Sequence, residues 1–323
     1  MVNEQSDARV HRTVHEAEAD APADVVYRLI ADTSRWPLYL PPNVQVEQLE
    51  TTGDTERLRM WATANGQVKS WTSRRVLDPA ARRVEFRQEV PAAPVESVGG
   101  TWIVTDLGAD RSLLTLLHDF TVAGDRAEDV EWVERAIDTN SRAELGNLST
   151  LAAGWARLEE RVVIFEDSVH VDGPAERVYE FLHRADLWPQ RLPHVDRLEL
   201  TEDEPGVQIM TMGTRTADGS VHTTESVRVC FPEDLRIVYK QTATPALMSA
   251  HTGCWTVRPA AGGGLTVTSR HSVVLREEAI EQALGAQADL ARARRHVREA
   301  LGRNSGATLE VAKRFAESAA LAR

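Results

Sequence analysis

Three side chains in one short segment combine an aromatic plate, a hydroxyl group and a cation. The segment 67–75 has the composition of a β-strand, in which alternate side chains share a face, so Trp71, Ser73 and Arg75 should point the same way. A packed core excludes this mixture, because buried polar groups cost free energy unless they have partners. The triplet therefore predicts either a cavity wall for an oxygen-rich, partly aromatic ligand or an exposed strand face whose tryptophan packs across the sheet.

A second candidate for chemistry is His118, which lies in the run Leu114-x-Leu116-x-His118-x-Phe120. This alternation is typical of an inward-facing strand face, whereas Asp119 falls on the opposite face and is not expected to act as a base. Imidazole changes its charge near neutral pH, so His118 could shuttle a proton inside a cavity. A core histidine with hydrogen-bonded nitrogens fits the same pattern, and the sequence leaves both interpretations open.

The first half of the chain supplies an ordered set of elements to position these side chains. A strand is predicted over 11–19, followed by a helix that begins at Pro22 and ends near Trp36-Pro37, since the residue before proline avoids helical backbone. Further strands follow, separated by turn residues, and a long amphipathic helix closes the half. The predicted strands are 44–51, 56–62, 68–77, 83–90, 100–106 and 113–122, and the helix is 127–161.

The second half of the chain repeats this order. Trp36-Pro37 matches Trp188-Pro189 at an offset of 188 − 36 = 152, and His118 matches His271 at 271 − 118 = 153, so one inserted residue accounts for the change. Other pairs at 153 are Asn65-Gly66 with Asp218-Gly219, Arg75 with Arg228, and Trp102 with Trp255. We interpret the chain as a duplicated domain with an α+β layout, because in each copy the strands follow one another through short turns and the helices are grouped at the ends.

Length and composition limit the remaining possibilities. The 323 residues suit two ordinary domains, and no run approaches the ~18 apolar residues of a membrane helix. The net charge of −12 argues against a nucleic-acid partner, although basic runs occur at 82–87 and 292–298. With two cysteines, Cys230 and Cys254, and no visible signal sequence, we expect a cytoplasmic protein without a disulfide framework. No motif for a metal or an organic cofactor is found, so none is predicted.

Taken together, the motifs resemble a known family. Ala21-Pro22, Trp36-Pro37 and the segment Asn65-Gly66-Gln-Val-Lys-Ser-Trp71-Thr-Ser73-Arg-Arg75 are similar to the aromatase/cyclases of bacterial type II polyketide synthases, and the duplication is similar to their di-domain subclass. The resemblance implies two tandem helix-grip domains, like pollen-allergen and steroid-transfer domains. In each, a curved antiparallel sheet would wrap around a long C-terminal helix and enclose a pocket. We place the two domains at 1–162 and 163–323.

The resemblance also implies an activity and partners. The pocket would take a poly-β-ketone chain from an acyl carrier protein, after a ketosynthase has made the chain and a ketoreductase of the same pathway has reduced one of its carbonyls. It would close the first ring by intramolecular aldol condensation and promote dehydration to an arene. Holding the chain in one bend is the larger requirement, because fixing the reacting atoms can remove ~7–11 kcal/mol of barrier.

Each candidate residue has an expected role in that chemistry. Arg75 would stabilise developing oxyanion charge, since it is permanently cationic with forked donors. Ser73 and Tyr39 would hydrogen-bond ketones, and His118 would move protons. The expected walls of the pocket are the indoles of Trp36, Trp71 and Trp102.

The second copy carries a diverged version of this site. Thr224 stands at the position of Trp71, and Arg191 at that of Tyr39, so the second pocket keeps charge but loses aromatic definition. We predict that the first domain performs the chemistry, while the second stabilises it or handles a later intermediate. The candidates for the second pocket are Arg228, Ser226, Trp188, Trp255 and His271.

Two other functions fit the same residues. A non-catalytic carrier would use the same cavity to bind a hydrophobic polyketide-like or lipid ligand, since fold alone does not decide function. A scaffold would recruit the carrier protein through its basic runs while ring closure proceeds spontaneously. The sequence does not indicate an oligomeric state.

Overall fold

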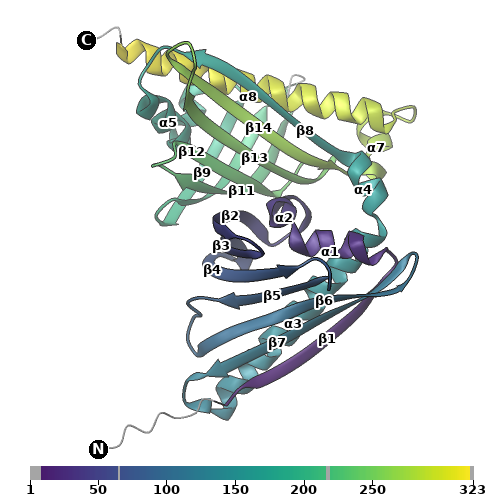
Figure 1. The fold of residues 1–323 in the computed structure, drawn as a ribbon. Coiled ribbons are helices and arrows are strands. Elements are labelled where there is room, and N and C mark those ends of the chain that lie inside the picture. The colour runs from purple at the N-terminus through teal and green to yellow at the C-terminus, as the bar shows by residue number, and fades with distance from the viewer. Residues whose placement is uncertain (1–8, 65, 216–218, 321–323) are drawn as a thin grey trace, which may run out of the picture. The chain divides into compact units, whose positions relative to one another are not determined.

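The structure is a computed structural model that describes residues 9–64, 66–215 and 219–320. The chain divides into two compact units, Met1–Arg157 and Leu158–Arg323. Within the described residues, each unit holds a seven-stranded antiparallel sheet and a long C-terminal helix (Figure 1), so the predicted α+β fold of two tandem helix-grip domains is confirmed. The predicted turn residues Asn65 and Asp218 lie outside the described ranges.

In the first unit the strands pair in the order β1-β7-β6-β5-β4-β3-β2. Hairpins join the strands from β2 to β7, and β1 then pairs with β7 at the end of the sheet. The strands are β1 (His11–Ala19), β2 (Asn43–Thr52), β3 (Thr55–Ala64), β4 (Gln67–Asp78), β5 (Arg83–Gln88), β6 (Val95–Gly108) and β7 (Arg111–Val122). The helices are α1 (Ala23–Ala31), η1 (Thr33–Arg35), α2 (Trp36–Tyr39), η2 (Ala123–Asp125), α3 (Ala127–Ala153) and α4 (Trp155–Arg161).

The second unit repeats the topology with the order β8-β14-β13-β12-β11-β10-β9. It differs by an additional helical segment between the last strand and the long helix. The strands are β8 (Val162–Val171), β9 (Val195–Glu204), β10 (Val207–Arg215), β11 (Val221–Phe231), β12 (Arg236–Ala243), β13 (Met248–Pro259) and β14 (Leu265–Leu275). The helices are α5 (Ala175–His183), η3 (Ala185–Leu187), α6 (Trp188–Arg191), η4 (Glu277–Ala279), α7 (Ile280–Leu284) and α8 (Leu290–Ala320).

The hydrophobic core of the first unit is formed by alternate apolar residues of the strands and by an apolar stripe along α3. Leu114 and Leu116 of β7 are fully buried, while α3 contributes Val133, Leu145 and Leu148, each 2% exposed. Helix α3 packs against β1, β7 and α1. Burying each of these side chains contributes roughly 1.5–3 kcal/mol, so the contact between helix and sheet holds the unit together.

Two predicted helix boundaries are wrong. Helix α1 ends at Ala31, before Trp36-Pro37. Pro37 lies in the first turn of α2, where backbone N–H groups have no partner within the helix, so its missing N–H costs no hydrogen bond. The helix predicted over 127–161 is interrupted at Gly154, which caps α3 and separates it from α4. Across the residues that the structure describes, no helix has the length and apolar character needed to cross a membrane.

Candidate functional site

A cavity of about 330 Å³ lies between the sheet and α3 of the first unit. The strands β3 to β7 supply one wall, α3 supplies the other, and α2 adds Trp36. The lining residues are Trp36, Met60, Trp71, Ser73, Arg75, Phe86, Gln88, Val98, Trp102, His118, Ile137, Asn140, Ser141 and Glu144.

Strand pairing explains why the candidate residues face this cavity. Arg75 of β4 pairs with Phe86 of β5, Phe86 pairs with Gly100 of β6, and Gly100 pairs with His118 of β7. Paired residues on neighbouring strands share a face of the sheet, so this row points toward α3. Ser73 and Arg75 are each only 3% exposed, which excludes the interpretation of the segment as an exposed strand face.

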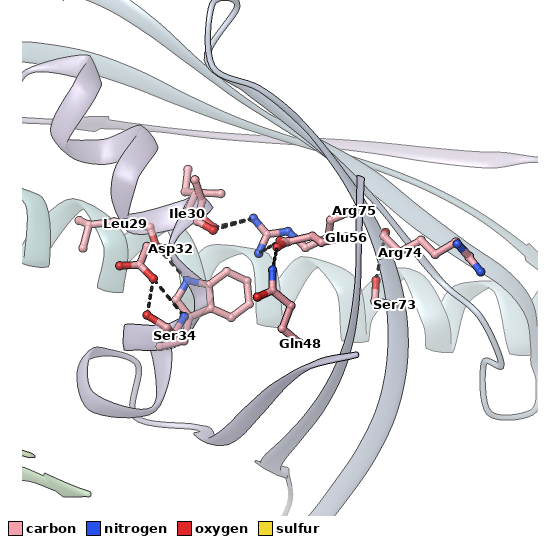
Figure 2. Close-up of polar contacts among 11 residues, drawn as sticks. Leu29, Ile30, Asp32, Ser34, Gln48, Glu56, Ser73, Arg74 and Arg75 are labelled. Carbon is pink, nitrogen blue, oxygen red and sulfur yellow. Dashed lines mark hydrogen bonds and ion pairs between the residues drawn. The ribbon is translucent and has the colours of Figure 1, made fainter. Parts of the chain in front are cut away.

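The two terminal nitrogens of Arg75 are engaged differently, because Nη2 makes hydrogen bonds whereas Nη1 makes an ion pair and has no hydrogen-bond acceptor among the described residues. Nη2 donates to the carbonyl oxygens of Ile30 at 2.9 Å and Ala31 at 3.3 Å, which lie at the C-terminal end of α1. Nη1 lies 3.2 Å from Oε1 of Glu56, and the other carboxylate oxygen of Glu56 accepts from Gln48 at 3.1 Å (Figure 2). Arg75 therefore links β3, β4 and the end of α1.

Trp36 completes this arrangement. Its indole N–H donates to the carbonyl oxygen of Leu29 at 2.9 Å, and the guanidinium carbon of Arg75 lies 5.2 Å from the centre of its ring. The carbonyl groups at the end of a helix have no partners within the helix, so side-chain donors there stabilise it. Trp36 and Arg75 together satisfy the carbonyls of Leu29, Ile30 and Ala31 while lining the cavity.

These contacts limit what Arg75 can do for a ligand. Burial lowers the pKa of its guanidinium, and the Glu56 carboxylate opposes that shift by neutralising the buried charge. In the oxyanion role expected from the sequence, a ligand oxygen that accepted from Nη1 would lie beside the carboxylate of Glu56, which opposes a second negative charge there. The geometry favours a positioning role, in which Arg75 holds Trp36 and the end of α1 in the cavity wall.

Ser73 is also engaged, because its hydroxyl donates to the carbonyl oxygen of Arg87 at 3.0 Å. A hydroxyl has two acceptor lone pairs besides its proton, so this bond leaves Ser73 able to accept a hydrogen bond from a ligand. Trp102 is 5% exposed and packs firmly into the wall, whereas Trp71 is only half-buried. Trp71 can therefore contact a ligand over more of its surface.

His118 is neutral at pH 7. Burial, with a smaller contribution from the neighbouring His15, lowers its pKa to about 4. Its ring meets the ring of Phe86 edge to face at 5.6 Å between centres. Gly100, which pairs with His118, makes room for this contact, since a Cβ atom there would lie 2.7 Å from the Phe86 ring. A neutral imidazole can accept a proton, as the sequence analysis expected of this residue.

The helix wall supplies an acidic group that the sequence analysis missed. Glu144 of α3 lines the cavity, and burial raises its pKa from an ordinary 4.5 to about 7. The residue is half-buried, and the surrounding protein removes much of the hydration of its carboxyl group. At neutral pH it can donate or accept a proton, which is the property of a general acid–base catalyst.

A signal for this wall was present in the sequence. Ile137, Asn140, Ser141 and Glu144 are spaced by three and four residues, so they lie on one face of α3. Polar residues on the stripe that otherwise carries Val133 and Leu145 indicate a face that meets a cavity rather than a packed core. The polar residues alone do not identify which one titrates near neutral pH.

Tyr39 is the one first-domain candidate that does not line the cavity. Its hydroxyl accepts a hydrogen bond from Nη1 of Arg35 at 3.2 Å, and its ring packs edge to face against Trp155 at 5.6 Å. Tyr39 is 7% exposed and fills the space beneath α2. The structure gives it contacts typical of a packing residue.

The second unit repeats the link between arginine, tryptophan and helix. Nη2 of Arg228 donates to the carbonyl oxygen of Leu182 at 2.5 Å, and its guanidinium carbon lies 5.3 Å from the ring centre of Trp188. The indole of Trp188 donates to the carbonyl oxygen of Phe181 at 3.1 Å. At the position of Glu56 the second unit has Gln208, which pairs with Arg228 across the strands and donates to Glu202 at 2.7 Å.

The second cavity is smaller, with a volume of about 110 Å³. All five residues predicted for the second pocket line it, namely Arg228, Ser226, Trp188, Trp255 and His271. Thr224 also lines it, whereas the guanidinium of Arg191 lies over the ring of Phe315 at 4.7 Å and is not among the lining residues.

The helix walls of the two cavities correspond as well. The lining residues Leu301, Asn304, Ser305 and Thr308 of α8 match Ile137, Asn140, Ser141 and Glu144 at a single offset, since 301 − 137 = 304 − 140 = 305 − 141 = 308 − 144 = 164. The offset grows from 153 to 164 because the second unit has the additional segment before its long helix. Thr308 therefore replaces the acidic group of the first cavity.

Comparison with known proteins places the whole chain. The profile of the family described as "Polyketide cyclase / dehydrase and lipid transport" matches residues 10–153 and again 162–310. The chain is 46% identical over 296 residues to the granaticin polyketide synthase bifunctional cyclase/dehydratase of Streptomyces virginiae, covering 91% of this chain and 96% of that relative. It is 44% identical over 309 residues to the actinorhodin polyketide synthase bifunctional cyclase/dehydratase of Streptomyces coelicolor, covering 93% and 95%.

Solved structures give the same answer. The di-domain ARO/CYC BexL from the BE-7585A biosynthetic pathway superposes with a TM-score of 0.88 at 50% identity, covering 95% of this chain and 99% of that one. The di-domain ARO/CYC StfQ from the steffimycin biosynthetic pathway superposes with a TM-score of 0.84 at 33% identity, covering 95% and 99%. The chain therefore belongs to the polyketide cyclase/dehydrase family, with the family's domain present twice, and is related over nearly its whole length to bifunctional cyclase/dehydratases of polyketide synthases.

Proposed function

We propose that this chain folds a poly-β-ketone carried on an acyl carrier protein, closes its first ring by intramolecular aldol condensation and removes water to form the arene. Kinship with bifunctional cyclase/dehydratases supports this reaction class. The observation that carries the assignment to the first cavity is that His118, a neutral imidazole at pH 7, and Glu144, a carboxyl group with a pKa of about 7, line the same space. We assign ring closure to the domain 1–162 and treat 163–323 as its diverged copy.

Chain binding would depend mainly on the aromatic walls. The indoles of Trp36, Trp71 and Trp102 can hold a flexible ketone chain in a bend that brings its reacting carbons together. Ser73 and Asn140 offer polar contacts to individual ketone oxygens. Arg75 acts indirectly, because it fixes Trp36 and the end of α1.

Proton transfer would use the two titratable groups. In the aldol step His118 takes a proton from the carbon that attacks, and Glu144 gives a proton to the oxygen of the ketone that is attacked. Before dehydration the proton held by His118 returns to Glu144, so that both groups regain their starting states. His118 then takes the proton from the C–H bond that breaks, and the C–O bond breaks as the hydroxyl group leaves as water with a proton from Glu144. The aldol step forms a C–C bond and the elimination releases water, and neither step needs an oxidant or a reductant, so the proposal invokes no cofactor.

The partners proposed for this reaction are the acyl carrier protein that bears the chain and the ketosynthase that makes it. A ketoreductase of the same pathway would act beforehand on one carbonyl. Membership of a family whose relatives belong to polyketide synthases supports partners of this kind.

The test is reconstitution with the ketosynthase, carrier protein and ketoreductase, with the cyclase at catalytic amounts and Glu144→Gln compared with wild type. We expect the variant to lose aromatic ring product by about 10²-fold, which is a typical contribution of a general acid. Glu134→Gln is the matched control, because Glu134 is exposed on the same helix. An unchanged product distribution on adding wild-type protein would contradict catalysis and leave the alternative, a carrier that only binds the chain.

A further inference from the structure

The surroundings of His271 differ systematically from those of His118. Three neighbours that are apolar in the first copy are polar in the second, all at the offset 239 − 86 = 251 − 98 = 269 − 116 = 153. Strand pairing supports the correspondence, since Gly100 pairs with His118 and Gly253 pairs with His271. The replaced pairs are Phe86 and Tyr239, Val98 and His251, and Leu116 and Ser269.

The three polar residues form a hydrogen-bonded cluster around His271. Nδ1 of His271 lies 3.1 Å from the hydroxyl of Tyr239 and 3.1 Å from Nε2 of His251. Nε2 of His271 lies 3.2 Å from the hydroxyl of Ser269. His251, Ser269 and His271 are 2%, 0% and 4% exposed. Each polar group added to a buried site costs free energy unless partnered, so this network is a built feature of the second unit.

The cluster carries no charge at neutral pH. Burial lowers the pKa of His271 to about 4, and burial together with His271 lowers that of His251 well below its ordinary value. Burial also raises the pKa of the Tyr239 hydroxyl, which therefore keeps its proton. Arg228, the permanently charged residue that lines this cavity, donates its hydrogen bonds to the carbonyl oxygens of Leu182 and His183.

Tyr239, His251 and His271 line the second cavity, together with six apolar residues and further polar ones. Among its described lining residues there is no carboxylate. Its volume of about 110 Å³ is of the order of the ~150 Å³ cavity that accepts benzene, and it is one third of the first cavity. The apolar wall residues are Trp188, Met210, Met212, Pro245, Trp255 and Leu301.

We propose that the second cavity is a separate binding site for one uncharged six-membered ring bearing a hydroxyl or enol oxygen, with Tyr239 as the group that recognises that oxygen. The phenolic hydroxyl of Tyr239 can donate to the ligand oxygen or accept from it, because the two histidines beside it can each supply or take the complementary hydrogen bond. An anion or a long ketone chain does not fit, since the wall is uncharged apart from an engaged arginine and the space holds a single ring. This site does not depend on the chemistry proposed for the first cavity.

The test uses the full chain with 13C-labelled histidine, its signals assigned with single-histidine variants, and phenol as the probe. We expect phenol to shift the signals of His251 and His271 saturably, with a Kd on the order of 1 mM for so small a ligand. Toluene, which has the same ring without the hydroxyl, should bind about 10-fold more weakly. The signal of His118 reports separately on the first cavity.

Tyr239→Phe is the decisive variant, because the first copy has phenylalanine at this position and the fold accepts it. It should weaken phenol binding at the second cavity by about 10-fold, the effect of losing one hydrogen bond, and leave toluene binding unchanged. Equal binding of phenol and toluene, no effect of the variant on phenol, or no saturable response of His251 and His271 would each overturn the proposal.

Discussion

Glu144 shows how a single residue can couple stability to chemistry. Its carboxyl group pays a desolvation penalty when ionised, which is why its pKa lies near 7 in the folded chain. A group with a raised folded pKa favours folding below its ordinary pKa and loses that contribution as the pH rises through the folded value. Glu144 should therefore destabilise the first unit increasingly between pH 4.5 and pH 7.

Glu144→Gln removes that dependence. Relative to wild type, the variant should gain stability on going from pH 5 to pH 8, by about 2 kcal/mol, because glutamine never ionises. Chemical denaturation at the two pH values measures this change, with Glu134→Gln as the exposed control. A difference between variant and wild type that is the same at both pH values would show that Glu144 has an ordinary pKa.

For single residues, the sequence predicts which strand residues line the cavity better than it predicts which helix residues do. Trp71, Ser73, Arg75 and His118 were identifiable because strand alternation depends only on local spacing. Glu144 was missed because its role depends on which face of a 27-residue helix meets the sheet and on how fully that contact dehydrates it. Neither property is local.

Among elements, the ends of α1 and α5 depend on a side chain from a distant strand. Arg75 and Arg228 each reach the last carbonyls of these helices and lie over a tryptophan. The repeat of this contact in two cavities with different chemistry indicates that it is primarily structural. The sequence predicted both arginines as pocket residues, but a single strand cannot show that their donors are taken by a helix end.

Arg75→Met and Arg228→Met should both destabilise their units, and by different amounts. Arg75→Met leaves the carboxylate of Glu56 buried without its partner, which costs about 3–5 kcal/mol. In the second unit the residue paired with Arg228 is the neutral Gln208, so Arg228→Met leaves no unpaired charge there. Its main effect is that the carbonyl oxygen of Leu182 loses its hydrogen-bond donor, which costs about 1–3 kcal/mol.

Thermal or denaturant unfolding of the two variants shows whether Arg75→Met loses more stability than Arg228→Met. Adding Glu56→Gln to Arg75→Met should recover part of the loss, since it removes the carboxylate that Arg75→Met leaves without its cation and places there the glutamine that the second unit has. Arg74→Met, which alters an exposed neighbour on β4, is the control. An equal loss in both units, or no recovery in the double variant, would contradict a buried ion pair at Arg75.

Over the whole molecule, the repeat was readable from the sequence while the cavities were not. Offsets of 152 and 153 identify the duplication because they depend only on chain order. The replacement of Trp71 by Thr224 removes an aromatic wall, yet the second cavity is the smaller one. Two lining residues of the second cavity are larger than their counterparts in the first, namely Tyr239 for Phe86 and His251 for Val98. Cavity volume depends on packing among many strands, which pairwise matches along the chain do not capture.

The central claim is that Glu144 in the first cavity supplies the acid for ring formation. The most direct measurement is the rate of aromatic product formation between pH 6 and pH 9, with the ketosynthase and carrier protein in excess so that the cyclase is limiting. The wild-type rate should fall above a pKa of about 7, and Glu144→Gln should give a low rate without that fall. A decline above pH 7 that persists in Glu144→Gln would contradict the claim.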